Sequence, residues 1–242
     1  MIKNSFCFME KIGPRKERAI WKQGVKDWAD FIARKKIKGI APAKKGYYDR
    51  QLRLAAAALA KEDSSHFKGK EAWRLYDHFR ESCGFLDVEI DSYGRIIVVG
   101  ISDYYTTKHF VKGLILERKL LQVELQKYTL LATYNGSAFD LPKLRKQFDI
   151  VTEVPHLDLK PLCQSIGYRG GLKEIEKILN LKRPPHLRGH PVELWKAFQA
   201  SGDREYLDLL LAYNAEDIEN LKQILDLVYA KKAALLRQIQ NI

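Results

Sequence analysis

The sequence predicts an α/β fold: a mixed β-sheet flanked by helices, preceded by a basic helical segment. Apolar runs near residues 84–90 and 95–103 have the length of strands, later strand-length runs alternate with helical patterns, and apolar residues in the C-terminal third recur at helical spacing. The 242 residues are 46% hydrophobic, enough for one good core and a smaller accessory unit. We therefore expect residues 1–80 to form a basic helical subdomain and residues 81–242 to form the α/β domain.

The expected α/β domain begins with an antiparallel meander. Strands near 84–90, 95–103 and 107–112 are joined by short connections, the first of which turns at Tyr93-Gly94. Alternating helices and strands follow, and the chain ends in helices. The later elements are a helix at 115–127, a strand at 129–134, a helix at 140–148, a strand at 155–159 and a helix at 172–179.

Nearly all of the excess positive charge lies in the first third of the chain. Residues 1–80 contain 20 Lys/Arg and 9 Asp/Glu, a net of +11, whereas the whole chain has 42 and 30, a net of +12. Amphipathic spacing predicts helices over Arg18–Phe31 and Asp49–Lys61. A basic helical unit beside a nearly neutral domain suits the binding of a polyanion.

Aromatic residues are interleaved with these cations. Single-stranded nucleic acid is bound by cations that follow its phosphates and by rings that stack on its bases. Tyr47 and Tyr48 are therefore candidate substrate-binding residues, although a place in the local core explains them equally well. For Trp21 and Trp28 we favour the core.

Two acids lie on the first predicted strand, where apolar side chains are expected. Side chains alternate across a strand, so Asp87 and Glu89 face one side and Leu86, Val88 and Ile90 the other. Neighbouring carboxylates on a largely dry surface repel each other. A shared divalent cation would remove that penalty, which makes metal binding the first hypothesis.

Two further acids repeat this pattern. Asp140 follows a predicted strand at the start of a helix, and Asp217 lies on the apolar stripe of the last helix, with Tyr213 one turn before it. Simpler explanations exist for each. Asp140 could cap its helix ahead of Pro142, and Tyr213 could form a buried hydrogen bond with Asp217. For Asp158, which also precedes a predicted helix, we favour a capping role over a supporting role at the site.

The residue types favour hard, oxygen-binding metals. Carboxylates suit Mg²⁺ and Mn²⁺, and two such ions can stabilise both the attacking and the leaving oxygen of a phosphodiester. Zinc is disfavoured because the three cysteines are far apart and the six histidines are scattered. Three cysteines without framework spacing indicate a reducing cytoplasm, and the sequence shows no apolar run of membrane-spanning length.

The motifs D-x-E, N-x-x-x-F-D and Y-x-x-x-D, in this order, resemble those of the DEDD exonucleases in the ribonuclease H-like superfamily, in the subgroup with a tyrosine in its third motif. The resemblance implies that Asp87, Glu89 and Asp217 hold one metal, that Asp87 and Asp140 act on a second, and that Tyr213 orients the attacking water. It also makes Asn135 and Phe139 candidate substrate-binding residues. Position 212 is Ala, so the variant with histidine five residues before the last Asp does not fit.

Within that superfamily the chain resembles the YprB-type exonuclease domain. Two upstream segments, Lys11–Trp21 and Trp73-Arg74-Leu75-Tyr76, loosely match its flanking patterns. The usual D-I-E-T-T-G continues here as Asp87-Val88-Glu89-Ile90-Asp91-Ser92, so the loop that helps to hold the scissile end differs. Arg188, in a Pro/Arg-rich turn, is a further candidate for phosphate contact.

The expected function is a metal-dependent 3′–5′ exonuclease that acts on single-stranded ends, with DNA slightly preferred over RNA. A ribonuclease H-like endonuclease is an alternative, which Tyr213 and the N-x-x-x-F-D motif disfavour. A catalytically silent nucleic-acid-binding module is another, and it would be expected to lack at least one of the four acids.

Overall fold

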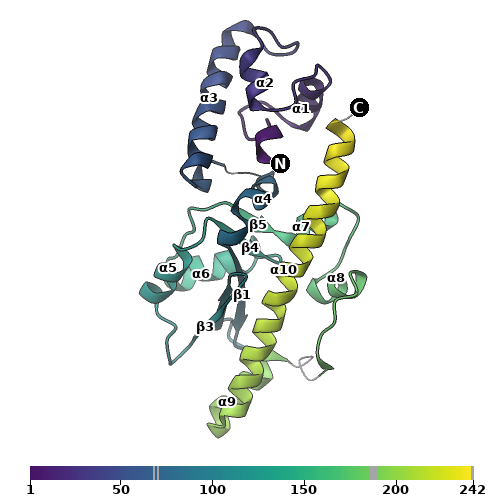
Figure 1. Cartoon of the computed structure of the whole chain (residues 1–242). Coiled ribbons are helices and arrows are strands. Elements are labelled where there is room, and N and C mark those ends of the chain that lie inside the picture. The colour runs from purple at the N-terminus through teal and green to yellow at the C-terminus, as the bar shows by residue number, and fades with distance from the viewer. Residues whose placement is uncertain (68, 70, 186–189, 241–242) are drawn as a thin grey trace. The chain divides into compact units, whose positions relative to one another are not determined.

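The structure is a computed structural model that describes residues 1–67, 69, 71–185 and 190–240 (Figure 1). The chain divides into two compact units. The first contains residues 1–80 together with 229–242, and the second contains residues 81–228. None of the helices in the described part of the chain combines the length and apolar character needed to cross a membrane.

The first unit is helical. The predicted helix over Arg18–Phe31 is wrong, because the chain turns after Trp21. The turn passes through Gly24, whose φ of +76° favours glycine. Asp27 then caps a new helix by accepting a hydrogen bond from the Asp30 N–H. The helix predicted at Asp49–Lys61 begins earlier, at Pro42. The α-helices of this unit are α1 (Pro14–Trp21), α2 (Trp28–Ala33), α3 (Pro42–Ala60) and α4 (Tyr76–Phe79).

Two indole rings and a tyrosine lie in the core of the first unit. Trp21 and Trp28 are both 5% exposed, and their ring N–H groups donate to the backbone carbonyls of Asn4 and Ser5. The core assignment of both tryptophans is therefore confirmed. Tyr48 is also buried, and its hydroxyl donates to the carbonyl of Glu10 at 3.1 Å.

The second unit contains a five-stranded mixed sheet of order β3-β2-β1-β4-β5. The first three strands form the expected antiparallel meander, and β4 and β5 extend the sheet from β1 in parallel. The predicted α/β fold class is thus confirmed. The strands are β1 (Cys83–Ile90), β2 (Ile96–Ser102), β3 (Thr107–Val111), β4 (Leu130–Thr133) and β5 (His156–Asp158).

Helices cover the sheet on both faces. Leu86 and Val88 of β1 pack into one core cluster with Leu121 and Leu144, whereas Val98 of β2 belongs to a second cluster on the other face. This second cluster includes Trp195, Leu207 and Leu210. The helices are α5 (Arg118–Leu125), α6 (Asp140–Phe148), α7 (Leu159–Gln164), α8 (Leu172–Ile178), α9 (Pro191–Ser201) and α10 (Arg204–Gln240), of which α10 continues beyond this unit.

The break between α9 and α10 has a local cause. Gly202 ends α9 with a φ of +72°, a backbone conformation that costs glycine little. Two residues later α10 begins, and its apolar stripe at Leu207, Leu210 and Ile218 is buried in this unit. That stripe directs one face of α10 toward the sheet, and Asp217 lies on the same face.

Candidate metal centre

Three carboxylates meet where β1 and α10 come together. Asp87 and Glu89 project from the same face of β1 because they are two residues apart, and Asp217 comes from α10. Each offers a ligand oxygen, and the three oxygens lie within 4.8 Å of one another. The structure thus brings together three of the four acids expected at the site.

These acids destabilise one another's charged forms. Burial and the neighbouring carboxylates of Glu89 and Asp217 raise the pKa of Asp87 well above its usual range. Burial and Asp217 raise the pKa of Glu89 to about 8. A divalent cation offsets such repulsion directly, and carboxylate oxygens are the ligands that Mg²⁺ and Mn²⁺ prefer. The cluster therefore fits a divalent cation in both chemistry and spacing.

Asp140 lies next to this cluster but is not one of its three close members. It is the first residue of α6, with Phe139 at the cap position, so the capping explanation is wrong. Its Oδ1 instead accepts a hydrogen bond from the Val88 N–H at 2.9 Å. This bond connects α6 to β1 at the residue between Asp87 and Glu89. Burial raises the pKa of Asp140 to about 7, and its charge adds to the raised pKa of Asp87.

Tyr213 lies one helical turn before Asp217 and is half-buried. Two cations flank its ring: Lys173 Nζ lies 4.9 Å and the Arg183 guanidinium 5.2 Å from the ring centre. Burial, followed by the charges of Asp217 and Glu89, raises the pKa of Tyr213. The hydroxyl therefore remains protonated at neutral pH, next to the acids.

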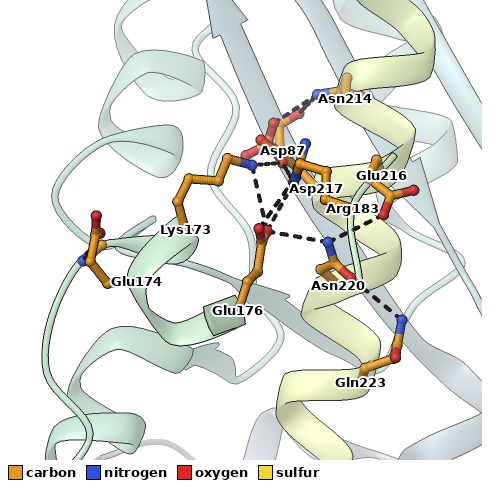
Figure 2. A network of polar contacts seen from close by, with 11 residues as sticks. Asp87, Lys173, Glu174, Glu176, Arg183, Asn214, Glu216, Asp217, Asn220 and Gln223 are labelled. Atoms are coloured by element: carbon orange, nitrogen blue, oxygen red, sulfur yellow. Dashed lines mark hydrogen bonds and ion pairs between the residues drawn. The ribbon is translucent and has the colours of Figure 1, made fainter. Parts of the chain in front are cut away.

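Two basic side chains neutralise Asp217. Lys173 on α8 and Arg183 both contact its Oδ1 (Figure 2). Arg183 is held in turn by Glu176, whose Oε1 lies 2.9 Å from Nη2 and also accepts from Asn220 at 3.2 Å. The side chains of Arg183 and Glu176 are only 7% and 5% exposed, so this pair is built into the interior.

Sequence reasoning did not identify this network of Lys173, Glu176, Arg183 and Asn220. One signal was present: Asn220 lies three residues after Asp217 on the buried face of α10 and is fully buried. A buried amide on an apolar stripe requires hydrogen-bond partners, which points to a polar neighbour. The identity of that neighbour depends on how α8 packs, and no local pattern reveals this.

The loop that leads into Asp140 is held by Asp158. Its carboxylate accepts hydrogen bonds from the N–H groups of Asn135 at 2.8 Å and Ser137 at 3.1 Å, and also from Lys160 at 3.1 Å at the start of α7. The predicted capping role of Asp158 is confirmed, and the same residue supports the loop. Asn135 adopts a left-handed backbone, with a φ of +64°.

The predicted substrate-binding residues are divided between the two units. Phe139 is half-buried beside Asp140, with Lys143 Nζ 5.7 Å from its ring centre. Tyr47 and Tyr48 belong to the first unit, where Tyr47 is 43% exposed and Tyr48 only 1%. Arg188 lies outside the described residues.

The sequence pattern of RNase_H_2, of the RNase_H superfamily, matches residues 84–229, more than half of the chain. The chain belongs to this superfamily. The match spans all five predicted catalytic residues. Nucleases of this superfamily typically use divalent metals, which the acid cluster could bind.

Among solved structures, the chain is similar to the family B DNA polymerase from the hyperthermophilic archaeon Pyrobaculum calidifontis. The two share 13% identity with a TM-score of 0.46, over 62% of this chain and 24% of the polymerase. A search of curated proteins finds no match.

Proposed function

We propose that this protein is a metal-dependent 3′–5′ exonuclease that hydrolyses phosphodiester bonds at the ends of single-stranded nucleic acid, with DNA slightly preferred over RNA. One observation carries the proposal: the oxygens of Asp87, Glu89 and Asp217 lie within 4.8 Å of one another in an RNase H-like domain. Tyr213, one turn before Asp217 on α10, adds a protonated hydroxyl beside them.

In this proposal the four acids hold two metal ions. Asp87, Glu89 and Asp217 would hold one Mg²⁺ or Mn²⁺, and Asp87 with Asp140 would hold a second. When bound, such ions supply an activated water and offset the charge that develops on the phosphate. Tyr213 would orient the attacking water through its hydroxyl, which the raised pKa keeps protonated and able to donate.

The basic first unit is proposed to bind the strand. On α3, Lys44, Tyr47, Arg50 and Leu54 are all exposed and recur at three- and four-residue spacing, so they share one face of the helix. A ring between two cations is the arrangement that suits a base flanked by phosphates. Tyr48 is left out of this path, because its ring is buried in the core.

The polarity of digestion tests the proposal. Linear single-stranded DNA and RNA labelled at the 5′ end, and a circular single strand of the same DNA sequence, are incubated with the protein in Mg²⁺, Mn²⁺ or EDTA. We expect a descending ladder from the 5′-labelled linear strands, an intact circle, and no digestion in EDTA. Cleavage of the circle would instead indicate an endonuclease, and binding of all substrates without cleavage would indicate a silent binding module.

A further inference from the structure

We propose that Asn214 and His109 are positioning residues that together fix the Asp87 carboxylate for metal binding, and that Gly100 provides the space in which they do so. This inference rests on the proposed function, since it assigns a support to one of the proposed metal ligands. Neither side chain belongs to the acid cluster itself. Both act through contacts on the sheet face that α10 covers.

Three neighbouring strands align Asp87, Gly100 and His109 in one row. Asp87 of β1 pairs with Gly100 of β2, and Gly100 pairs with His109 of β3. Directly opposed residues in a sheet project to the same face. The carboxylate and the imidazole therefore project to the same face, on either side of a position that has no side chain.

Asn214 fills the space that a side chain at position 100 would occupy. A Cβ placed on Gly100 would collide with the Asn214 amide oxygen and would come within 2.6 Å of Ile218 Cδ1. The amide of Asn214 thus lies directly on the backbone of β2, between Asp87 and His109. Glycine inside a strand commonly marks such a close approach, and here it lets α10 bring a polar group down to the sheet.

Asn214 binds Asp87 with its amide nitrogen. Nδ2 donates to Asp87 Oδ2 at 2.8 Å and lies 3.4 Å from the Asp87 backbone carbonyl (Figure 2). The Asp87 backbone carbonyl can only accept, as can its ionised carboxylate, so these contacts orient the amide with its nitrogen toward Asp87 and Oδ1 facing away. Asn214 is fully buried, so Oδ1 also requires a partner.

His109 is the group placed to supply that partner. Among the described residues, Asn214 Oδ1 and His109 Nε2 are both buried polar atoms without a hydrogen-bond partner. The two side chains nevertheless influence each other: burial lowers the pKa of His109, and the neighbouring Asn214 side chain opposes this. A neutral His109 that carries its proton on Nε2 would donate to Oδ1 and satisfy both atoms.

The result is a chain of hydrogen bonds, here called the relay, that runs from His109 through Asn214 to Asp87 Oδ2 and fixes the position of that carboxylate. Packing alone does not explain Asn214, because burying an amide is unfavourable unless its polar atoms are bonded, and an apolar side chain would fill the same space. Groups that orient a metal ligand typically change metal affinity or activity 10–100-fold when removed. The relay is therefore expected to act on metal affinity before any substrate is present.

Metal binding by the full-length protein tests the relay. Isothermal titration of Mn²⁺ into the protein without nucleic acid is compared for wild type, His109→Leu, His109→Gln and Asn214→Leu. His78→Leu is the matched control, because His78 is an exposed histidine in the first unit. Thermal unfolding in EDTA, recorded for each variant, separates loss of fold from loss of metal.

We expect His109→Leu and Asn214→Leu to weaken Mn²⁺ binding by about 10-fold or more, and His109→Gln, which keeps a donor, to recover most of the affinity. Unchanged affinity in His109→Leu, or equal losses in His109→Leu and His109→Gln, would overturn the relay. If Asn214→Leu fails to fold, the comparison of His109→Leu with His109→Gln still tests the relay. A wild-type protein that binds no Mn²⁺ would refute the proposed function instead, so the two failures are distinguishable.

Discussion

Arg74 and Glu17 form a buried, two-pronged ion pair in the first unit, with Nη1 and Nη2 each 2.9 Å from a carboxylate oxygen. The two residues are 57 positions apart, and their side chains are only 3% and 1% exposed. Glu17 also accepts from the Phe6 N–H at 2.6 Å. The upstream motif residues Glu17 and Arg74 thus hold together the fold of the basic unit.

Removing one partner of this pair should destabilise the first unit strongly. We expect Arg74→Met to lower the free energy of unfolding by about 3–5 kcal/mol, because it leaves the Glu17 carboxylate buried and unpaired. Denaturant unfolding followed by tryptophan fluorescence reports mainly on this unit, since three of the four tryptophans, Trp21, Trp28 and Trp73, lie in it. Arg18→Met, at an exposed position on α1 next to Glu17, is the control. A loss below about 1 kcal/mol in Arg74→Met would show that the pair contributes little.

The stability of the metal-free protein should fall as the pH rises, through Glu89. Its pKa is about 8 in the folded protein and about 4.3 in an unfolded chain. Between these values the unfolded chain releases the proton and the folded protein retains it, so the folded state loses stability as the pH increases. In EDTA, Glu89→Gln should therefore gain thermal stability relative to wild type between pH 5 and pH 8.

Two comparisons make the Glu89 prediction specific. Glu219→Gln removes an exposed acid from α10 and should show no such pH-dependent gain. Saturating Mn²⁺ should raise the thermal midpoint of wild type more at pH 8 than at pH 5, because at pH 8 metal binding has to displace less proton from Glu89. A constant difference between Glu89→Gln and wild type across this pH range would contradict the raised pKa.

Tyr213→Phe should impair cleavage less than loss of a metal ligand does. The change removes an orienting hydroxyl, so we expect a decrease in kcat of at most about 10²–10⁴-fold, with Mn²⁺ affinity retained. Single-turnover digestion of a labelled strand gives the rate, and titration with Mn²⁺ gives the affinity. If Tyr213→Phe is as inactive as Asp87→Ala and also binds Mn²⁺ poorly, the hydroxyl has a structural role.

The exposed face of α3 should govern the salt dependence of binding. In an inactive Asp87→Ala background, Lys44→Gln with Arg50→Gln should make the plot of log affinity against log salt shallower by about 0.7 for each phosphate that the protein no longer neutralises. Fluorescence anisotropy with a labelled single strand measures the slope. Arg118→Gln with Lys119→Gln, two exposed positions next to each other on α5, is the charge-matched control. Equal slopes for both double variants would exclude α3 from the strand path.

The fold could largely be predicted from the sequence, because its signals are local. Strand alternation in β1 placed Leu86 and Val88 opposite Asp87, and helical periodicity placed Asp217 toward the sheet, as observed. The error over Arg18–Phe31 is also local in origin: the apolar spacing continues through a turn that depends on the backbone of Gly24. Periodicity records which side chains are buried and does not record where the chain reverses.

The site could be predicted only in part. The acids were visible as charges at apolar positions, which are rare enough to stand out in a single sequence. Arg183, Glu176 and His109 could not be identified in the same way, because their roles depend on contacts between segments far apart in the chain. Gly100 did indicate a close approach of another group, since a glycine interrupts an apolar strand there. Which residue comes close depends on the packing of α10, so Asn214 could not be predicted.

The most direct test compares two acids on the same helix, two residues apart. Asp217 lies in the cluster, whereas Glu219 is 54% exposed and pairs with Lys222. Single-turnover digestion of a 5′-labelled single strand in Mn²⁺ is measured for wild type, Asp217→Asn and Glu219→Gln. We predict 3′–5′ shortening at similar rates by wild type and Glu219→Gln, and none by a folded Asp217→Asn protein. Digestion by Asp217→Asn at the wild-type rate would contradict the assignment of the active site.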